Sequence, residues 1–290
     1  MGGAWHAAVR EVSLQVSANE TLAVVGESGS GKSVTALSVL RLLPESAARH
    51  GGGQILLDGV DLTMLSEKQM TKLRGEAIAM IFQEPMTSLN PTMTVGDQIA
   101  EAIQQHRRLS RKEARRLAFE VLEEVKIPAA AKRFNDYPHQ FSGGMRQRVM
   151  IAMALACKPR VLLADEPTTA LDVTIQAQIL SLLSELKTAH GMGVVFITHN
   201  LGVVAQIADR VAVMYAGEVV ETADVQTLFA RPMHPYTEAL LRAMPRVDAD
   251  STVLESIPGG VPAINALPKG CAFAPRCRLK EGAARPNGQI

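Results

Sequence analysis

The stretch that decides the fold is Gly26-Glu27-Ser28-Gly29-Ser30-Gly31-Lys32-Ser33, which follows the apolar run Thr21-Leu22-Ala23-Val24-Val25. It fits the phosphate-binding pattern of glycine, any four residues, then Gly-Lys-Ser/Thr. Glycines let the backbone curl with its N–H groups toward phosphate oxygens, and the next helix adds the positive end of its dipole. In such a loop Lys32 reaches the β- and γ-phosphates and Ser33 ligates Mg²⁺. The alternative is a glycine-rich turn that binds nothing. The loop, however, lies between a predicted strand and a predicted helix, as phosphate binding requires.

A second apolar run, Val161-Leu162-Leu163-Ala164-Asp165-Glu166, ends in two carboxylates. Asp165 is suited to hold Mg²⁺, directly or through water, and Glu166 to polarise an attacking water. Strands often end in acidic residues, so this pattern alone is weak evidence. Beside a phosphate loop, it predicts a site that hydrolyses a nucleotide.

A third stretch, Phe141-Ser142-Gly143-Gly144-Met145-Arg146-Gln147-Arg148, places Ser-Gly-Gly before a predicted helix. A hydroxyl and exposed backbone amides at a helix start make an anion site. An ordinary helix cap would explain Ser142 and one glycine. It would not explain two glycines followed by Met-Arg-Gln-Arg and then by the Asp-Glu strand.

Apolar strand patterns alternate with helical patterns along most of the chain, which predicts an α/β fold with a mostly parallel sheet and helices on both faces. A capping box of Ser110 and Glu113 predicts where one of the helices begins. The expected strands cover residues 9–16, 21–26, 54–59, 78–82, 161–164, 194–198 and 211–215. The expected helices cover residues 34–43, 110–125, 143–157, 173–189 and 200–208.

Two departures from this alternation predict the domain organisation. Residues of about 90–158 contain helical patterns without a strand, so they are expected to form a helical subdomain inserted into the sheet domain of residues 1–230. Prolines recur from about residue 231. Residues 231–290 are therefore expected to form an irregular C-terminal extension.

Composition limits the class of protein. The 290 residues carry 30 Lys and Arg against 29 Asp and Glu, a net charge of +1, so no bulk affinity for nucleic acid is expected. Three cysteines in a chain of this length indicate a reduced, cytoplasmic protein without a disulfide framework. The N-terminus lacks a signal-peptide pattern, and no apolar run approaches the roughly 20 residues that span a bilayer. If the protein works at a membrane, other chains are expected to span it.

In this order the motifs resemble the ABC ATPase family, whose signature usually reads Leu-Ser-Gly-Gly-Gln. Phe141 and Met145, at the two ends of that signature here, resemble variants of the peptide-transporter branch. The resemblance covers about residues 10–230 and implies a RecA-like P-loop NTPase core with ATP and Mg²⁺ as cofactors. It assigns Gln83 to the Q-loop, Ala170-Leu171-Asp172 to the D-loop and His199 to the switch histidine.

The resemblance therefore implies a set of functional residues. Taken singly, Gln83 could be a surface amide, Asp172 a helix cap and His199 a structural histidine. Together with the other motifs, the expected catalytic residues are Glu166, His199 and Gln83. The expected Mg²⁺ ligands are Ser33, Gln83 and Asp165, and the expected signature residues are Ser142, Gly143, Gly144 and Met145.

Two further stretches resemble the ATPases of dipeptide, oligopeptide and nickel importers. They are Glu84-Pro85-Met86-Thr87-Ser88-Leu89-Asn90-Pro91 and a tail that includes His234-Pro235-Tyr236-Thr237 and Gly270-Cys271-Ala272-Phe273-Ala274-Pro275-Arg276-Cys277. The resemblance implies an ATP-hydrolysing subunit that powers import of peptides or similar small solutes. An exporter ATPase, an ABC ATPase outside transport and an unrelated P-loop kinase are the alternatives. The exporter lacks this tail, non-transport members usually carry two cassettes or a long coiled coil, and a kinase would not need the signature.

The family resemblance also implies partners. In this family the site is split between two ATPase subunits, so Ser142, Gly143 and Gly144 are expected to contact a γ-phosphate bound to a partner, either a second copy or a sister ATPase. Transmembrane permease subunits are the other direct partners, and an external solute-binding protein an indirect one. The expected location is peripheral, on the cytoplasmic face of the inner membrane.

The front and the tail depart from the family pattern. The N-terminal antiparallel β portion is expected to be truncated, with one strand in residues 9–16 and the strand before it missing. Trp5 is then either the aromatic residue that stacks on adenine or an ordinary terminal tryptophan. Cys271 and Cys277 cannot supply the four thiolates of an iron–sulfur cluster, so they are interpreted as a remnant pair.

Overall fold

A six-stranded sheet forms the centre of the molecule in the computed structural model, which describes residues 5–84, 88–169, 171–244 and 256–281. The strand order is β4-β5-β6-β1-β7-β8, and every neighbouring pair is parallel except β7 and β8. The mostly parallel sheet expected from the sequence is therefore confirmed. Its strands are β1 (Thr21–Val25), β4 (Ile78–Ile81), β5 (Val161–Asp165), β6 (Gly193–Thr198), β7 (Arg210–Tyr215) and β8 (Glu218–Asp224).

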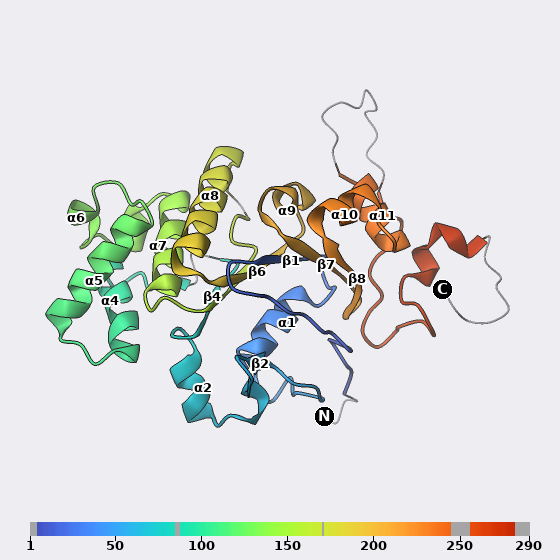
Figure 1. The fold of residues 1–290 in the computed structure, drawn as a ribbon, viewed down its shortest axis with the longest axis horizontal. Coiled ribbons are helices and arrows are strands. Elements are labelled where there is room, and N and C mark those ends of the chain that lie inside the picture. The colour runs from blue at the N-terminus through green and yellow to red at the C-terminus, as the bar shows by residue number, and fades with distance from the viewer. Residues whose placement is uncertain (1–4, 85–87, 170, 245–255, 282–290) are drawn as a thin grey trace.

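Helices cover both faces of the sheet because successive strand residues point to opposite sides. In β1, Ala23 and Val25 pack in the apolar cluster that includes α9 and α10, whereas Val24 packs in the cluster that includes α1. Figure 1 shows α8, α9 and α10 on one face and α1 on the other. These helices are α1 (Lys32–Val39), α8 (Val173–His190), α9 (Leu201–Ile207) and α10 (Val225–Ala230).

A group of helices lies between β4 and β5 in the chain and at one end of the sheet in space (Figure 1). The capping box predicted at the start of α5 is confirmed, because the Glu113 carboxylate accepts the Ser110 N–H at 3.0 Å and Ser110 Oγ accepts the Glu113 N–H at 3.3 Å. Apolar side chains of α7 and of the strands share one core cluster. The group comprises α4 (Val95–His106), α5 (Arg111–Glu124), α6 (Ala130–Arg133) and α7 (Gly143–Leu155).

The strand expected over residues 9–16 was a wrong prediction. In the described structure these residues pair with no strand, and the backbone at Glu11 is left-handed, with φ of 47°. The segment lies against the turn between β7 and β8, where the Arg10 N–H donates to the Gly217 carbonyl at 2.7 Å. The strand expected over 54–59 is shorter than predicted: the small antiparallel pair consists of β2 (Leu56–Leu57) and β3 (Val60–Asp61), beside α2 (Glu67–Leu73).

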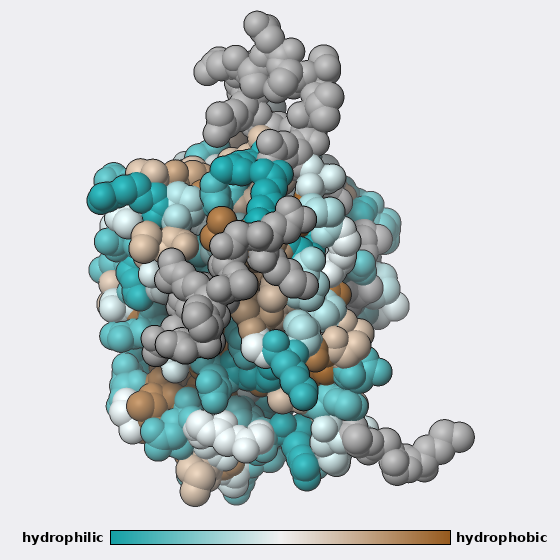
Figure 2. Space-filling model, turned by 90° about the vertical axis from the view of Figure 1, so that its right-hand side faces the viewer, coloured by the Kyte–Doolittle hydropathy of each residue, from teal (hydrophilic) through white to brown (hydrophobic). Residues whose placement is uncertain are grey.

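The C-terminal extension is more regular than expected. Helix α11 (Pro235–Arg242) begins with proline, and the His234 side chain accepts the Tyr236 N–H at 3.1 Å as its cap. Two short 3₁₀ turns follow at η3 (Ala274–Arg276) and η4 (Arg278–Glu281). Apolar side chains of the extension pack in the same cluster as β7 and α9. On the face shown in Figure 2, hydrophilic side chains predominate and apolar ones are scattered.

Candidate active site

The predicted phosphate loop connects the carboxyl end of β1 to the start of α1. Its backbone requires glycine at Gly26, where φ is 154° and an added Cβ would lie 2.2 Å from the Met214 carbonyl oxygen. The Ser30 side chain is buried, and its hydroxyl has no hydrogen-bond partner in the part of the chain that the structure describes. The sequence thus folds into a tight turn at a helix start, the geometry that suits an anion.

Lys32 is held over this loop by the loop's own backbone. Its Nζ donates to the Gly26 carbonyl at 2.7 Å and to the Glu27 carbonyl at 3.0 Å, and the residue is buried. Burial lowers the pKa of Lys32, while the nearby carboxylates of Glu166 and Asp165 act in the opposite direction. An anion in the loop would favour the charged form of this amine further.

Asp165 ends β5 with one carboxylate oxygen available. Its Oδ1 is buried and has no hydrogen-bond partner among the described residues. Burial raises the pKa of Asp165, and a hydrogen bond from Ser33 acts in the opposite direction. A buried oxygen without a partner, beside a serine hydroxyl, suits a hard cation such as Mg²⁺.

Glu166 is the point where the predicted catalytic residues meet. Its backbone is left-handed, with φ of 47°. Gln83 Nε2 donates to its Oε2 at 3.1 Å, and His199 Nδ1 lies 3.0 Å from its Oε1. The three residues come from the ends of β4, β5 and β6, which are neighbours in the sheet. The structure therefore brings together the three residues that were predicted to act in catalysis.

A fourth residue, Thr169, was missed by the sequence analysis. Its Oγ1 donates to Glu166 Oε2 at 2.9 Å. Burial alone would raise the pKa of Glu166, but the hydrogen bonds from His199 and Thr169, together with nearby positive charge, outweigh it and lower that pKa overall. A hydroxyl three residues after the Asp-Glu pair was the available signal.

The predicted signature caps α7. Ser142 Oγ accepts the Met145 N–H at 3.4 Å, so the two glycines occupy the first helical positions. An added Cβ at Gly144 would lie 2.5 Å from Ile175 Cγ2, which explains the second glycine, whereas at Gly143 the nearest atom would be 3.8 Å away. Within the described residues, no hydrogen bond joins the signature to the phosphate loop of the same chain.

The remaining predicted residues lie apart from Glu166. Asp172 caps α8 by accepting the Ile175 N–H at 2.9 Å, while Ala170 lies outside the described residues. Trp5 is half exposed, and the Arg49 guanidinium lies 4.5 Å from its ring centroid. Cys271 and Cys277 are free thiols that pack against the apolar cluster of the extension.

Comparisons with known proteins identify the family of this chain. Residues 9–169 match the ABC transporter family, and residues 220–283 match the C-terminal region of oligopeptide and dipeptide transporters. The chain is 56% identical over 282 residues to a peptide import ATP-binding protein of Brucella melitensis, which covers 93% of this chain and 83% of the relative. The chain belongs to the ATP-binding proteins of peptide ABC transporters. The family resemblance of the sequence is thereby confirmed.

This ABC ATPase has further close relatives. It is 54% identical over 270 residues to the dipeptide transport ATP-binding protein DppD of Bacillus subtilis, covering 93% of this chain and 82% of the relative. The solved dimer of the ATP-binding cassette MJ0796 with ADP and Pi matches with a TM-score of 0.68 and 31% identity, covering 78% of this chain and 94% of that one. The expected ATP-hydrolysing subunit and its α/β cassette fold are confirmed, and the kinase alternative is excluded. In the described residues no helix is long and apolar enough to cross a bilayer.

Proposed function

We propose that this ABC ATPase binds MgATP on Gly26–Ser33 and hydrolyses it with Glu166 to drive peptide import. The observation that carries the proposal is the convergence of Gln83, Thr169 and His199 on Glu166. A carboxylate held ionised by these contacts, one residue after the buried Asp165, is suited to polarise a water that attacks the γ-phosphate. Hydrogen bonds from three elements fix its position, and positioning supplies much of the catalysis in phosphoryl transfer.

The donor set fits Mg²⁺. Ser33, Gln83 and Asp165 offer a hydroxyl, an amide oxygen and a buried carboxylate oxygen, which are the ligands that this hard cation prefers. The Gln83 amide nitrogen is engaged by Glu166, so its amide oxygen is the atom left for a metal. When bound, Mg²⁺ would neutralise phosphate charge, while Lys32 would supply the fixed positive charge of the chain itself.

A second ATPase subunit completes this proposed site. Ser142, Gly143, Gly144 and Met145 form a helix start with amides suited to an anion, and no phosphate loop of their own chain pairs with them within the described residues. Asp172 and the 83% exposed Val173 are at the start of α8 and are suited to the same contact. They are close to Leu171 and Ile175, which are the neighbours of Gly143 and Gly144. The partner is either a second copy or a sister ATPase.

Permease subunits are the other partners that we propose. Phe82, next to Gln83, is 42% exposed, and Tyr137 is 40% exposed beside a groove of about 360 Å³. We propose that residues 84–91, which resemble the importer ATPases, line the docking cleft for the permease; residues 85–87 of these lie outside the described structure. A peripheral position on the cytoplasmic face of the membrane follows from this docking, with a solute-binding protein reached only through the permease.

The test separates binding from hydrolysis. Glu166→Gln should bind MgATP as the wild type does but release phosphate roughly 100-fold more slowly or worse, the scale expected for loss of a general base. Glu185→Gln is the matched control, since Glu185 lies on the surface of α8 and pairs with Lys126. Wild-type rates of phosphate release in Glu166→Gln would refute the assignment.

A further inference from the structure

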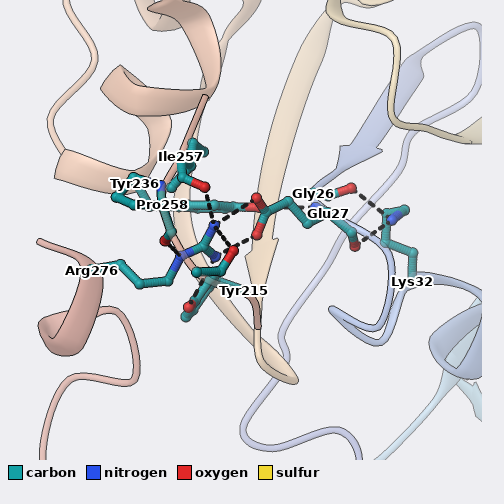
Figure 3. A network of polar contacts seen from close by, with 9 residues as sticks. Gly26, Glu27, Lys32, Tyr215, Tyr236, Ile257, Pro258 and Arg276 are labelled. Atoms are coloured by element: carbon teal, nitrogen blue, oxygen red, sulfur yellow. Dashed lines mark hydrogen bonds and ion pairs between the residues drawn. The ribbon is translucent and has the colours of Figure 1, made fainter. Parts of the chain in front are cut away.

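The C-terminal extension contacts the phosphate loop through Glu27, the only acidic residue of Gly26–Ser33. Arg276 donates from Nη1 to Glu27 Oε2 at 2.6 Å and from Nη2 to Glu27 Oε1 at 2.9 Å, a two-pronged ion pair between residues 249 positions apart. Figure 3 shows the Glu27 carboxylate pointing toward Arg276, on the opposite side from Lys32.

Arg276 is fixed by more than this pair. Its side chain is only 6% exposed. Its Nε donates to the Pro258 carbonyl at 2.7 Å, and its two Nη groups also donate to the Ile257 carbonyl at 3.2 Å, the Gly259 carbonyl at 3.5 Å and Tyr215 Oη at 3.3 Å. The guanidinium is therefore built into the extension and not a mobile surface charge.

Tyr236 of α11 holds the backbone of the same loop residue. Its Oη accepts the Glu27 N–H at 2.9 Å, and its fully buried ring lies 4.5 Å from that of Tyr215 and 5.3 Å from that of Phe273. Burial raises the pKa of Tyr236, which keeps the phenol neutral. The extension thus binds both the amide and the carboxylate of Glu27.

The charge of Glu27 explains why its contacts with the extension matter. The loop is suited to a polyanion, yet it carries one carboxylate, Glu27, beside its one amine, Lys32. The negative charge of Glu27 acts on the Lys32 amine: it raises the pKa of Lys32, although burial lowers this pKa by more. An uncompensated carboxylate in the loop would repel the phosphate chain of a nucleotide bound there. Arg276 supplies the compensating charge from 249 residues away.

We propose that Arg276 is a positioning residue of the nucleotide site: it neutralises Glu27 and turns its carboxylate away from the bound nucleotide. The C-terminal extension thereby sets the affinity of the loop for ATP. This inference rests on the proposed function, in that the loop must bind the nucleotide phosphates. It differs from a purely mechanical brace, which would hold the loop in shape whatever the charge of Glu27.

The charge explanation and the mechanical brace differ in what they predict for Glu27→Gln and for the double variant. MgADP affinity of the full chain is measured by calorimetry. Arg276→Met should weaken binding about tenfold at low salt, and less at high salt because screening shields the exposed Glu27 charge. Glu27→Gln should bind as tightly as the wild type or more tightly. The double variant should return to within about threefold of the wild type. Arg242→Met, which breaks the exposed pair with Glu238 in the same extension, is the matched control.

A mechanical brace gives the contrary pattern. Glu27→Gln and the double variant would then bind MgADP as weakly as Arg276→Met, without salt dependence, and the proposal would be overturned. If Arg276→Met fails to fold, the Glu27→Gln arm decides alone, since weaker binding contradicts the proposal. Loss of the proposed function is recognised separately, because the wild type would then fail to bind MgADP or Lys32→Ala would bind it normally.

Discussion

At the end of β5, Glu166 is contacted by side chains from Gln83, Thr169 and His199, whereas Ser142 at the start of α7 caps only its own helix within the described residues. Both places are suited to ATP hydrolysis, one through a carboxylate that can polarise the attacking water and one through backbone amides that can hold an anion. The group around Glu166 is assembled within one chain. The start of α7 is exposed and has no ligand-binding counterpart from the same chain in the described structure. This difference is what we expect if one chain carries two halves of two different sites, as proposed above.

The largest expected effect comes from placing a charge on the outward half. Gly143→Asp puts a carboxylate where we expect the γ-phosphate of a partner, so hydrolysis should fall about 100-fold while the single chain binds MgADP as before. The added Cβ has room, with its nearest neighbour Leu171 Cδ2 at 3.8 Å. Phosphate release and calorimetry measure the two properties.

Gly143→Ala is the control for this variant, since it adds the same Cβ without charge and should retain most of the activity. If Gly143→Asp hydrolysed ATP at the wild-type rate, the signature would have no part in the site, and the comparison would fail.

A smaller effect is expected inside the assembled half. Thr169→Val removes a hydrogen bond to Glu166 and should slow hydrolysis about tenfold. That bond lowers the pKa of Glu166, so its loss raises the pKa, and activity should be lost at a higher pH as the solution is acidified. A pH profile of phosphate release tests this sign.

Thr188→Val provides the comparison, because Thr188 is an exposed α8 residue whose hydroxyl bonds only the Ser184 carbonyl of its own helix in the described structure. An unchanged acid limb in Thr169→Val would show that the hydroxyl does not act on Glu166.

The smallest effect concerns stability at the start of α8. Asp172→Ala removes the cap on the Ile175 N–H and should lower the free energy of unfolding by about 1 kcal/mol, measured in urea. Asp172→Asn keeps a capping oxygen and should restore most of that loss. If Asp172→Asn had the ATPase activity of the wild type, the carboxylate charge would have no role at the expected subunit contact.

Much of the site follows from the sequence because its parts are short motifs at strand ends. The family resemblance assigned Gln83 and His199, and the structure explains why they meet Glu166: the carboxyl ends of neighbouring parallel strands lie at one edge of the sheet. The available signal for Thr169 was its position three residues after the Asp-Glu pair, and it was missed because a threonine in a turn is weak evidence by itself. The strand expected over residues 9–16 failed because the residue pattern does not reveal the left-handed backbone at Glu11 or the absence of a strand partner in the described structure.

The contact between Glu27 and Arg276 lay beyond sequence reasoning for a different reason. The two residues are 249 positions apart, and neither belongs to a periodic pattern that would predict their meeting. Glu27 could be assigned to the loop, but the direction of its side chain depends on how the extension packs on β7. Such long-range pairs emerge only once the fold has placed the extension.

The most direct test of the central claim, that each site needs two subunits, is the ATPase activity per chain of the wild type as its concentration is varied. A split site predicts activity that rises with chain concentration and vanishes on dilution, because the signature of one chain must reach the phosphate loop of another. Constant activity per chain down to concentrations at which the protein is a monomer would contradict it.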